Sequence, residues 1–395
     1  GFTNYDNQGI YGLEAEYTSI LSATPGRQIS AKNAVGETLP TSYEQYYPAQ
    51  DGNSLVLTID QVAQHYLEKT LGATIAQHAP AEGAAGIVMD VNTGGILAMA
   101  SMPNCNLNEP YVLTDEAAAA AIDAMADGDE KTAALQAARE KQWKNKGVTD
   151  IYEPGSVFKV VTASAALEEG AATLNSSYNC KGSVMVDGWP RPIHCHNHAG
   201  HGLQTFTEAV VNSCNPAFIS IGSSLGAHRF FQYFDAFGLT EKTGIDLPAE
   251  AQNSYYAEDR LNAVSLASCS FGQSNTVTPI QMITAASAAI NGGKLLTPHV
   301  VSKILDSDGN TVEEFGTQVR RQVISEETSK TMSEVLEQVV SANGGTNAYV
   351  KGYRIGGKTG TADKTGTSDV VVSFMCFAPA DDPQYIMLLT MDTPS

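Results

Sequence analysis

Long apolar runs are missing from this 395-residue sequence. None approaches the roughly 18 residues that a membrane-spanning helix needs, and the N-terminus lacks a basic segment followed by an apolar signal core. Even so, 43% of the residues are hydrophobic, which is enough for a sizeable buried core. The length therefore allows one large globular domain and a smaller piece.

Positive charge is also scarce. The sequence has 23 basic and 43 acidic residues, which gives a formal net charge of -20. Nucleic acids and anionic membrane surfaces are bound mainly through positive charge, so this balance disfavours both. No nucleic-acid partner is expected.

Cysteines number only six, too few for a disulfide scaffold. Four of them stand singly in the sequence and are expected to be small, buried, apolar side chains. These four are Cys105, Cys214, Cys269 and Cys376. The remaining pair, Cys180 and Cys195, lies among histidines and calls for a different interpretation.

Apolar spacing predicts an α+β fold with strands at both ends of the sequence and helices between them. Residues 1 to about 50 show little periodicity and are expected to be irregular or extended. Strands are predicted over 54–59, 85–90, 95–101, 354–362, 370–378 and 385–391, with the second and third forming a central hairpin. Helices are predicted over 61–71, 156–170, 207–225 and 279–291, with two surface helices between 115 and 146 that break at Gly128.

The first motif that indicates chemistry is a serine followed by a lysine three residues later. Pro154 and Gly155 precede Ser156, which places this serine in the first turn of a helix, and Lys159 follows on the same face. A serine hydroxyl is a weak nucleophile until a base removes its proton, and a desolvated lysine can be that base. Alone, this spacing is common by chance in helices.

Two further motifs raise the specificity. Ser213 and Asn215 offer a hydroxyl that can relay a proton and an amide that can hold it. The run Lys358-Thr359-Gly360-Thr361 places a cation on a predicted strand whose glycines allow a ligand backbone to approach. A substrate carboxylate can bind there. The three motifs in this order are jointly specific for serine acyl transfer.

These motifs and their flanks resemble the class B penicillin-binding proteins, which are monofunctional cell-wall transpeptidases. The middle cysteine of Ser213-Cys214-Asn215 is part of this likeness, which is closest to the division and sporulation branch of Gram-positive bacteria. The flanks that carry it are Gly9 to Tyr17, Trp143 to Lys146, Tyr152 to Ser156, Lys242 to Leu247, Phe271 to Gln273 and Thr278 to Gln281.

The resemblance implies a penicillin-binding/β-lactamase-like transpeptidase domain over 51–395, an antiparallel sheet flanked by helices. Residues 1–50 are then the remnant of an N-terminal pedestal or dimerisation domain, and the C-terminal end is expected to be truncated. The expected location is the outer face of the cytoplasmic membrane, with a single-pass anchor outside this sequence. Expected partners are peptidoglycan stem peptides, β-lactams, a membrane glycosyltransferase, and division or sporulation proteins.

The resemblance also implies roles for the motif residues. Ser156 attacks the penultimate D-Ala of a stem peptide, Lys159 takes its proton, and Ser213, held by Lys159 and Asn215, passes a proton to the leaving amine. Lys358 and the hydroxyls of Thr359 and Thr361 hold the terminal carboxylate, beside Gly360 on the same strand. No cofactor is required for catalysis. The alternatives are a D,D-carboxypeptidase or penicillin hydrolase with the same nucleophile, and a β-lactam sensor or inactive scaffold.

A metal site is a separate prediction. Cys180 and Cys195 flank a glycine-rich, hairpin-like stretch, and the second cysteine is surrounded by His194, His196, His198 and His201. Thiolates with imidazoles suit a structural Zn²⁺. The predicted ligands are Cys180, Cys195 and His198, with His196 or Asp187 as the fourth, while His201 matches the family's usual Gly-His-Gly element. The alternatives are a Cys180–Cys195 disulfide or two free thiols.

Overall fold

The computed structural model describes residues 1–29, 45–343, 346–364 and 366–395. The chain divides into two compact units. The first unit comprises Gly1–Leu57, Asp246–Pro248 and Val301–Gly316, and the second comprises Thr58–Ile245, Ala249–Val300 and Thr317–Ser395. Residues 30–44 of the predicted N-terminal remnant lie outside the described residues.

The first unit differs from the predicted continuous segment because strand pairing brings in later parts of the chain. Strand β5 (Ser54–Leu57) pairs antiparallel with β13 (Val301–Leu305), which also pairs with β14 (Thr311–Glu314). Asp246 accepts hydrogen bonds from the Tyr17 hydroxyl and from the N–H of Val301. The other elements of this unit are β1 (Phe2–Thr3), β2 (Gly9–Tyr11), α1 (Gly12–Glu16), α2 (Thr18–Leu21), β3 (Arg27–Ile29) and β4 (Gln45–Tyr47).

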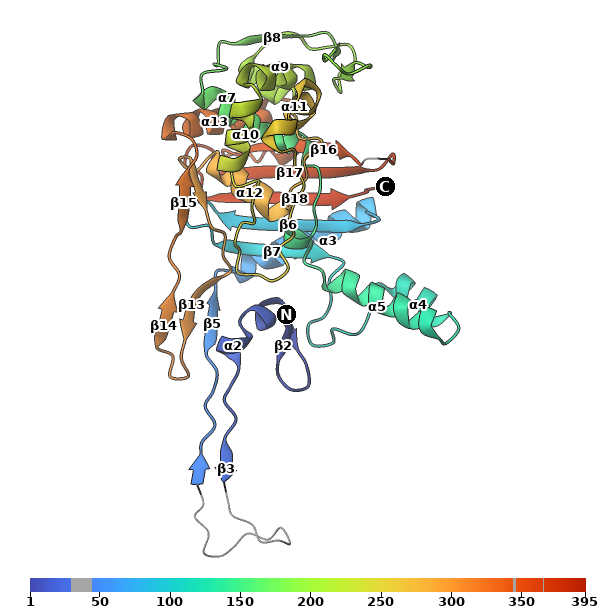
Figure 1. Cartoon of the computed structure of the whole chain (residues 1–395), viewed down its shortest axis with the longest axis vertical. Coiled ribbons are helices and arrows are strands. Elements are labelled where there is room, and N and C mark those ends of the chain that lie inside the picture. Colours follow the sequence, from blue (N-terminus) through green and yellow to red (C-terminus); the bar gives the residue numbers. More distant parts are fainter. Residues whose placement is uncertain (30–44, 344–345, 365) are drawn as a thin grey trace, which may run out of the picture. The chain divides into compact units, whose positions relative to one another are not determined.

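A five-stranded antiparallel sheet forms the centre of the second unit (Figure 1). Its spatial order is β16 (Gly356–Asp363), β17 (Val370–Ala378), β18 (Tyr385–Asp392), β6 (Gly83–Asp90) and β7 (Ile96–Met102). The C-terminal strands pair with the early hairpin, which confirms the predicted α+β class and the late closure of the sheet. The hairpin is not central, however, because β7 is an edge strand and β18 occupies the middle.

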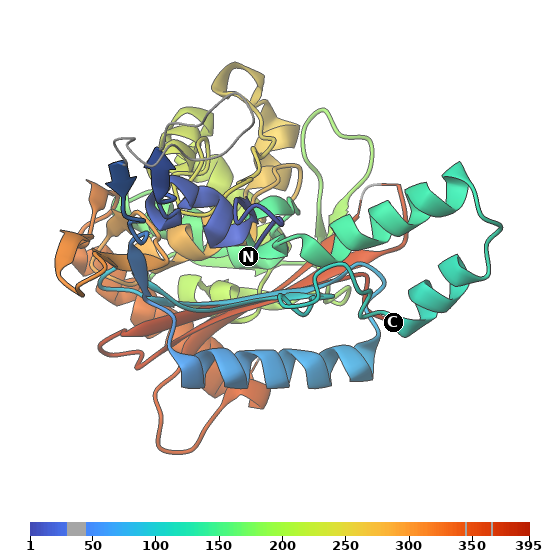
Figure 2. The same ribbon diagram turned by 90° about the horizontal axis from the view of Figure 1, so that it is seen from below.

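Helices cover both faces of this sheet. Helix α3 (Gln61–His78) begins at Asp60, whose carboxylate caps the N–H groups of Val62 and Ala63, and it runs along the lower side of the sheet in Figure 2. Its buried Leu67 and Leu71 pack against small side chains of β6 and β7. Helix α12 (Pro279–Ala288) contacts β6 and β18. Apolar burial on both faces makes the sheet a rigid support for the site.

The other elements of the second unit are mostly helical. They are α4 (Glu116–Asp123), α5 (Asp129–Trp143), α6 (Lys146–Thr149), η1 (Gly155–Phe158), α7 (Lys159–Glu168), α8 (Phe206–Val211), α9 (Asn215–Leu225), α10 (Ala227–Ala236), η2 (Glu258–Arg260), α11 (Ala263–Cys269), α13 (Glu326–Gln338), η3 (Val339–Asn343) and η4 (Thr346–Ala348). Short strands are β8 (Ser177–Cys180), β9 (Ser183–Val184), β10 (Ile193–His194), β11 (Gly202–Thr205), β12 (Lys294–Leu296) and β15 (Val319–Gln322). Among the described residues, no helix is both long and apolar enough to cross a membrane.

One predicted helix is wrong in a way that matters for the site. The sequence over 207–225 was expected to be continuous, but it forms α8 and α9 with a break between Val211 and Asn215. Ser213 in the break has a φ of 49°, a left-handed conformation that a helix cannot contain. Pro216 follows in the first turn of α9, where its missing N–H costs nothing. The break therefore contains the second sequence motif, which is Ser213 with Asn215.

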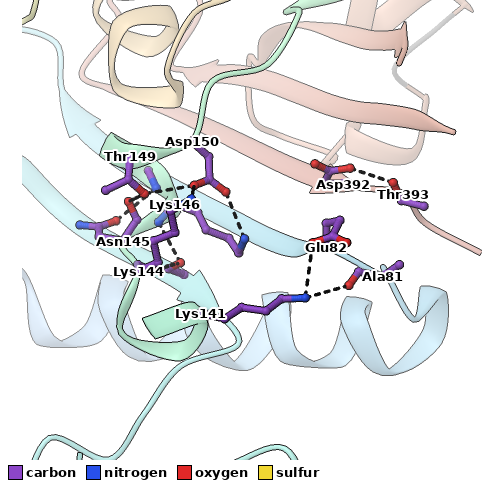
Figure 3. A network of polar contacts seen from close by, with 12 residues as sticks. Ala81, Glu82, Lys141, Lys144, Asn145, Lys146, Thr149, Asp150, Asp392 and Thr393 are labelled. Atoms are coloured by element: carbon purple, nitrogen blue, oxygen red, sulfur yellow. Dashed lines mark hydrogen bonds and ion pairs between the residues drawn. The ribbon is translucent and has the colours of Figure 1, made fainter. Parts of the chain in front are cut away.

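An ion-pair network holds α5 and α6 beside the start of β6 (Figure 3). The Nζ atoms of Lys144 and Lys146 lie 2.9 Å and 3.1 Å from the carboxylate of Asp150, and Lys141 lies 3.4 Å from Glu82. Burial opposes the charge on Asp150, but hydrogen bonds from Lys144 and Lys146 prevail and lower the pKa of Asp150. This network positions the segment that leads into Tyr152 and the Ser156 turn.

Candidate active site

Ser156 lies in the short 3-10 turn η1, which continues directly into α7, so the structure confirms the predicted helix start. The turn is fitted closely against β16. Gly155 has a φ of 54°, and a Cβ atom there would lie 2.6 Å from the carbonyl oxygen of Thr361. The N–H of Gly155 donates to the carbonyl oxygen of Gly272 at 2.9 Å. Only glycine allows this approach, which brings the Ser156 hydroxyl to the strand.

Lys159 is almost completely buried one turn after the serine, at 1% exposure. Its Nζ atom donates to Asn215 Oδ1 at 2.7 Å, to the Ser213 carbonyl oxygen at 2.7 Å and to Ser213 Oγ at 3.2 Å. Burial, followed by the charge of Lys358, lowers the pKa of Lys159 well below its usual value. A lysine in this setting is suited to accept a proton at neutral pH.

Ser213 and Asn215 lie in the break between α8 and α9. Helix α8 begins with a capping box in which Thr205 and Glu208 satisfy each other's backbone N–H groups, so the helix is firmly anchored. The Asn215 amide donates to the carbonyl oxygen of His194 at 3.2 Å. Its Oδ1 atom is thereby directed to Lys159.

Strand β16 carries the third motif. Lys358 is 1% exposed, and its Nζ atom donates to Ser213 Oγ at 2.8 Å. Burial lowers the pKa of Lys358 to about 7. Thr359 and Thr361 are exposed, as the alternation of a strand requires. Between them, a Cβ atom on Gly360 would lie 2.5 Å from Ser373 Oγ and 3.0 Å from the Pro154 carbonyl oxygen, so this glycine permits the close packing of strand and turn.

These elements enclose a pocket of about 350 Å³. Six of the eight predicted catalytic and substrate-binding residues line it: Ser156, Ser213, Asn215, Thr359, Gly360 and Thr361. The other two, Lys159 and Lys358, are buried and hydrogen-bonded to Ser213. The structure thus brings all three motifs together. Four lining residues were not predicted for this pocket: His201, Val211, Asn212 and His196, the last of which was predicted only as a metal ligand.

The pocket residues suit acyl transfer. A half-buried serine hydroxyl lies with a second hydroxyl, two desolvated lysines and an amide, and the exposed threonines provide hydroxyl donors. Nucleophile, proton acceptor and carboxylate-binding groups are all present.

A cysteine cluster adjoins this pocket, and its members differ in part from the predicted metal ligands. The side-chain ligand atoms of Cys180, Cys195, Cys214 and His201 all lie within 4.8 Å of one another. His198 lies outside the cluster, with its ring 5.4 Å from that of His194. His196 and Asp187 are also absent from it, although His196 Nδ1 lies 3.9 Å from Cys195 Sγ.

The difference from the predicted set arises from tertiary contacts. Antiparallel pairing of β8 with β11 sets Cys180 opposite Gly202, which brings His201 beside the thiol. The break before α9 turns Cys214, the N-cap residue of that helix, into the same cluster. Cys214 is buried as expected, but in the company of two other thiols. Its place inside the Ser213 motif was the signal that could have identified it.

Comparisons with known proteins agree with the geometry. The family model "Penicillin binding protein transpeptidase domain" matches residues 84–395. Stage V sporulation protein D of Bacillus subtilis is 38% identical over 100% of this chain and 58% of its own length. Peptidoglycan D,D-transpeptidase FtsI of Escherichia coli is 27% identical over 100% of this chain and 60% of its own length. The chain therefore spans less than two thirds of these relatives.

Solved structures show the same fold. Penicillin binding protein 3 of Mycobacterium tuberculosis superposes with a TM-score of 0.81 at 25% identity, covering 100% of this chain and 81% of that one. The same protein has been solved in complex with aztreonam and with ampicillin. A peptidoglycan synthetase of Bifidobacterium adolescentis gives a TM-score of 0.83 at 23% identity, over 100% of this chain and 67% of that one.

Proposed function

The chain belongs to the class B penicillin-binding proteins, as its motifs predicted, and from this premise we propose that it carries the catalytic domain of a peptidoglycan D,D-transpeptidase. The observation that carries the proposal is the convergence of Lys159 and Lys358 on the Ser213 hydroxyl beside the pocket that Ser156 lines. The curated relative FtsI of Escherichia coli has this activity in its name.

The first half-reaction forms an acyl-enzyme. Ser156 Oγ attacks the carbonyl carbon of the penultimate D-Ala, and the serine proton passes to neutral Lys159. The bond from that carbon to the nitrogen of the terminal D-Ala then breaks, and a proton passes through Ser213 to the leaving amine. The backbone N–H groups of Ser156 and Thr361 stabilise the oxyanion that forms in between. The stem peptide is left as an ester on Ser156.

The second half-reaction transfers the acyl group to another stem peptide. An acceptor amine attacks the ester carbonyl and loses a proton to the Lys159 and Ser213 relay, while Ser156 Oγ leaves and takes a proton back. The product is a peptide cross-link and the free enzyme. No cofactor enters either half-reaction. A β-lactam acylates Ser156 as the donor does in the first half-reaction. It stays attached because the acyl group is not transferred to an acceptor.

Substrate binding follows from β16. Lys358 and the hydroxyls of Thr359 and Thr361 hold the terminal carboxylate of the donor, and Gly360 lets the donor backbone approach the strand. Because Lys358 is buried, solvent screens its charge poorly, so the protonated side chain attracts a bound anion more strongly. This role separates an active enzyme from a sensor or scaffold, which has no need of the two buried lysines.

The wider setting is part of the same proposal. The substrate belongs to the cell wall, so the domain acts at the outer face of the cytoplasmic membrane, held by a single-pass anchor outside this sequence. The name of one relative, Stage V sporulation protein D, supports sporulation proteins as partners. A membrane glycosyltransferase and division proteins are proposed as partners from the family resemblance alone. Residues 1–50 are proposed as the remnant of the N-terminal pedestal, and 51–395 as the transpeptidase domain.

Intact-mass spectrometry after incubation with ampicillin tests the nucleophile. We expect one drug mass on the wild type, located on the Ser156 peptide, and no adduct on Ser156→Ala. The exposed serine of α9, Ser220, supplies a matched control, because Ser220→Ala should be acylated like the wild type. Hydrolysed drug without an adduct would favour a penicillin hydrolase, and neither adduct nor hydrolysis would favour a scaffold.

A D-Ala-D-Ala donor peptide with an acceptor amine then separates transfer from hydrolysis. The proposal expects a cross-linked product that grows with the acceptor concentration. Release of D-Ala with only the hydrolysed donor would make the domain a carboxypeptidase instead.

A further inference from the structure

We propose that Cys180, Cys195, Cys214 and His201 bind one structural Zn²⁺ ion, and that this ion holds Ser213 and Asn215 in the geometry that acylation needs. The metal site stands on its own geometry. The second half of the proposal rests on the proposed function, because it concerns the reaction of Ser156.

The four proposed ligands come from separate segments that meet next to the pocket, where His201 belongs to both the pocket lining and the cluster. Cys180 ends β8, Cys195 follows β10, His201 precedes β11 and Cys214 is the N-cap of α9. The three thiols are buried, at 2%, 1% and 0% exposure. The packing of small apolar side chains alone does not explain why three thiols and an imidazole converge on one point.

The distances suit a tetrahedral ion. With Zn–S bonds of about 2.3 Å and Zn–N bonds of about 2.0 Å, neighbouring ligand atoms of a tetrahedron lie roughly 3.5–3.8 Å apart. Cys195 Sγ and His201 Nδ1 are 3.6 Å apart, and all four ligand atoms lie within 4.8 Å of one another. Shifts of about an ångström would close the remaining distances.

The donor set favours zinc in a closed, structural site. Three thiolates and one imidazole are ligands of the softness that Zn²⁺ accepts, and four protein ligands leave no position for water or substrate. Binding forms four bonds from the ion to the protein in place of its bonds to water, and releases the thiol protons to solvent. A disulfide, by contrast, joins only two of the three thiols and leaves the third buried in the cluster.

The link to catalysis is direct because Cys214 stands between Ser213 and Asn215. Both neighbours bind Lys159. The residue before Cys195, His194 at the end of β10, supplies the carbonyl oxygen that accepts from Asn215. An ion bound to Cys195 and Cys214 therefore holds together the two segments that orient Asn215. Cys214 is a positioning residue and touches no reacting atom.

The metal site is tested by zinc content and by Co²⁺ substitution. Purified wild type, reduced and supplied with Zn²⁺, should retain about one zinc ion per chain, and its Co²⁺ form should show thiolate-to-cobalt charge-transfer absorption. Cys214→Ser and His201→Ala should lose most of the zinc. His198→Ala and Cys105→Ser, which alter residues outside the cluster, should retain it. No zinc in the wild type, a disulfide that persists under reduction, or full retention in both ligand variants would overturn the site.

The link to acylation is tested on the wild type, which avoids dependence on folding of a variant. Removal of zinc with a chelator should slow acylation by ampicillin at least tenfold at a temperature where circular dichroism shows a folded domain, and added Zn²⁺ should restore the rate. Equal rates with and without zinc would remove the link and leave the transpeptidase proposal intact. A zinc-loaded wild type that is never acylated would instead remove the proposed function, and with it the link, while the metal site stands.

Two substitutions of Cys214 separate positioning from packing. Serine is close to cysteine in size but is a poor zinc ligand, so Cys214→Ser should be acylated at least tenfold more slowly. Aspartate can replace a thiolate as an anionic ligand, so Cys214→Asp should keep part of the zinc and part of the rate. If the serine variant lost its zinc and kept the wild-type rate, the link would be wrong.

Discussion

The Nζ atom of Lys358 lies 2.8 Å from Ser213 Oγ, and both atoms belong to segments that are distant in the sequence. Lys159 reaches the same hydroxyl at 3.2 Å. Two buried ammonium groups beside one hydroxyl repel each other, and burial penalises both charges. The arrangement therefore favours a neutral Lys159 next to a Lys358 that still carries its proton below about pH 7.

This pair predicts how acylation depends on pH. Lys159 must be neutral to act as a base, so the second-order rate should rise as the pH passes through its lowered pKa. Lys358 loses its charge as the pH rises through about 7, and the rate for an anionic penicillin should fall there. We expect a bell-shaped profile in stopped-flow acylation between about pH 5 and 9.

A matched variant assigns the falling limb of this profile. Lys358→Arg keeps a positive charge at every pH in the range, so its falling limb near pH 7 should vanish even if the maximal rate drops. In the wild type, bound anion stabilises the charged lysine, and saturating ligand should move the limb to higher pH. A falling limb at the same pH in the arginine variant would assign it to another group.

The sequence predicted contacts between residues that are close in the chain better than contacts between distant residues. Ser156 and Lys159 lie one helical turn apart, so their proximity followed from helix geometry. The contact between Ser213 and Lys358 was expected only because the three motifs occur together. It joins residues that are distant in the sequence, so helix or strand geometry alone does not predict it. The strands could be predicted because their residues alternate between apolar and polar or are continuously apolar. Their order in the sheet, with β18 in the middle, could not be predicted from these patterns.

The proposed metal ligands show which contacts the sequence did not predict. His198 is close to Cys195 in the sequence, and nearness alone made it a candidate. The fold places His201, and not His198, in the cysteine cluster, because the β8–β11 pairing brings His201 to Cys180. Cys214 was not among the candidates because it stands singly in the sequence and was expected to be a small, buried, apolar side chain; the break between α8 and α9 places it in the cluster. Both differences come from tertiary contacts, which the spacing of residues in the sequence does not predict.

Gly360→Ala should damage both stability and acylation. The added Cβ would lie 2.5 Å from Ser373 Oγ and 3.0 Å from Val157 Cγ2, so β16 must move away from the Ser156 turn. We expect a loss of about 1–3 kcal/mol in the free energy of unfolding and a fall of about tenfold to a hundredfold in the acylation rate. Urea unfolding and stopped-flow acylation measure the two effects.

Gly72→Ala provides the control for this substitution. A Cβ at Gly72 meets no atom within 4 Å, and alanine is the better residue in the middle of α3. This variant should be more stable by about 0.5–1 kcal/mol and should be acylated at the wild-type rate. Wild-type stability and acylation in Gly360→Ala would show that strand and turn are not packed as closely as their geometry requires.

Asp150 should contribute stability that depends on pH. Its pKa is lowered by Lys144 and Lys146, so the contribution is present above the pKa of the unfolded state and is lost as the pH falls through the lower folded value. Its side chain is 32% exposed, so solvent screening limits the effect. We expect Asp150→Asn to lose about 1 kcal/mol at pH 7, and the difference from the wild type should shrink toward pH 3. Thermal unfolding at both pH values measures it.

The exposed pair of Asp127 with Lys131 is the matched control, because its carboxylate is 96% exposed while the two charged atoms are also 3.0 Å apart. An ion pair so open to solvent contributes little. Asp127→Asn should therefore unfold like the wild type at both pH values. If Asp150→Asn behaved in the same way, the network in Figure 3 would hold the segment before Ser156 by packing rather than by charge. If it lost stability equally at pH 7 and pH 3, the loss would belong to the shape of the side chain and not to its ionisation.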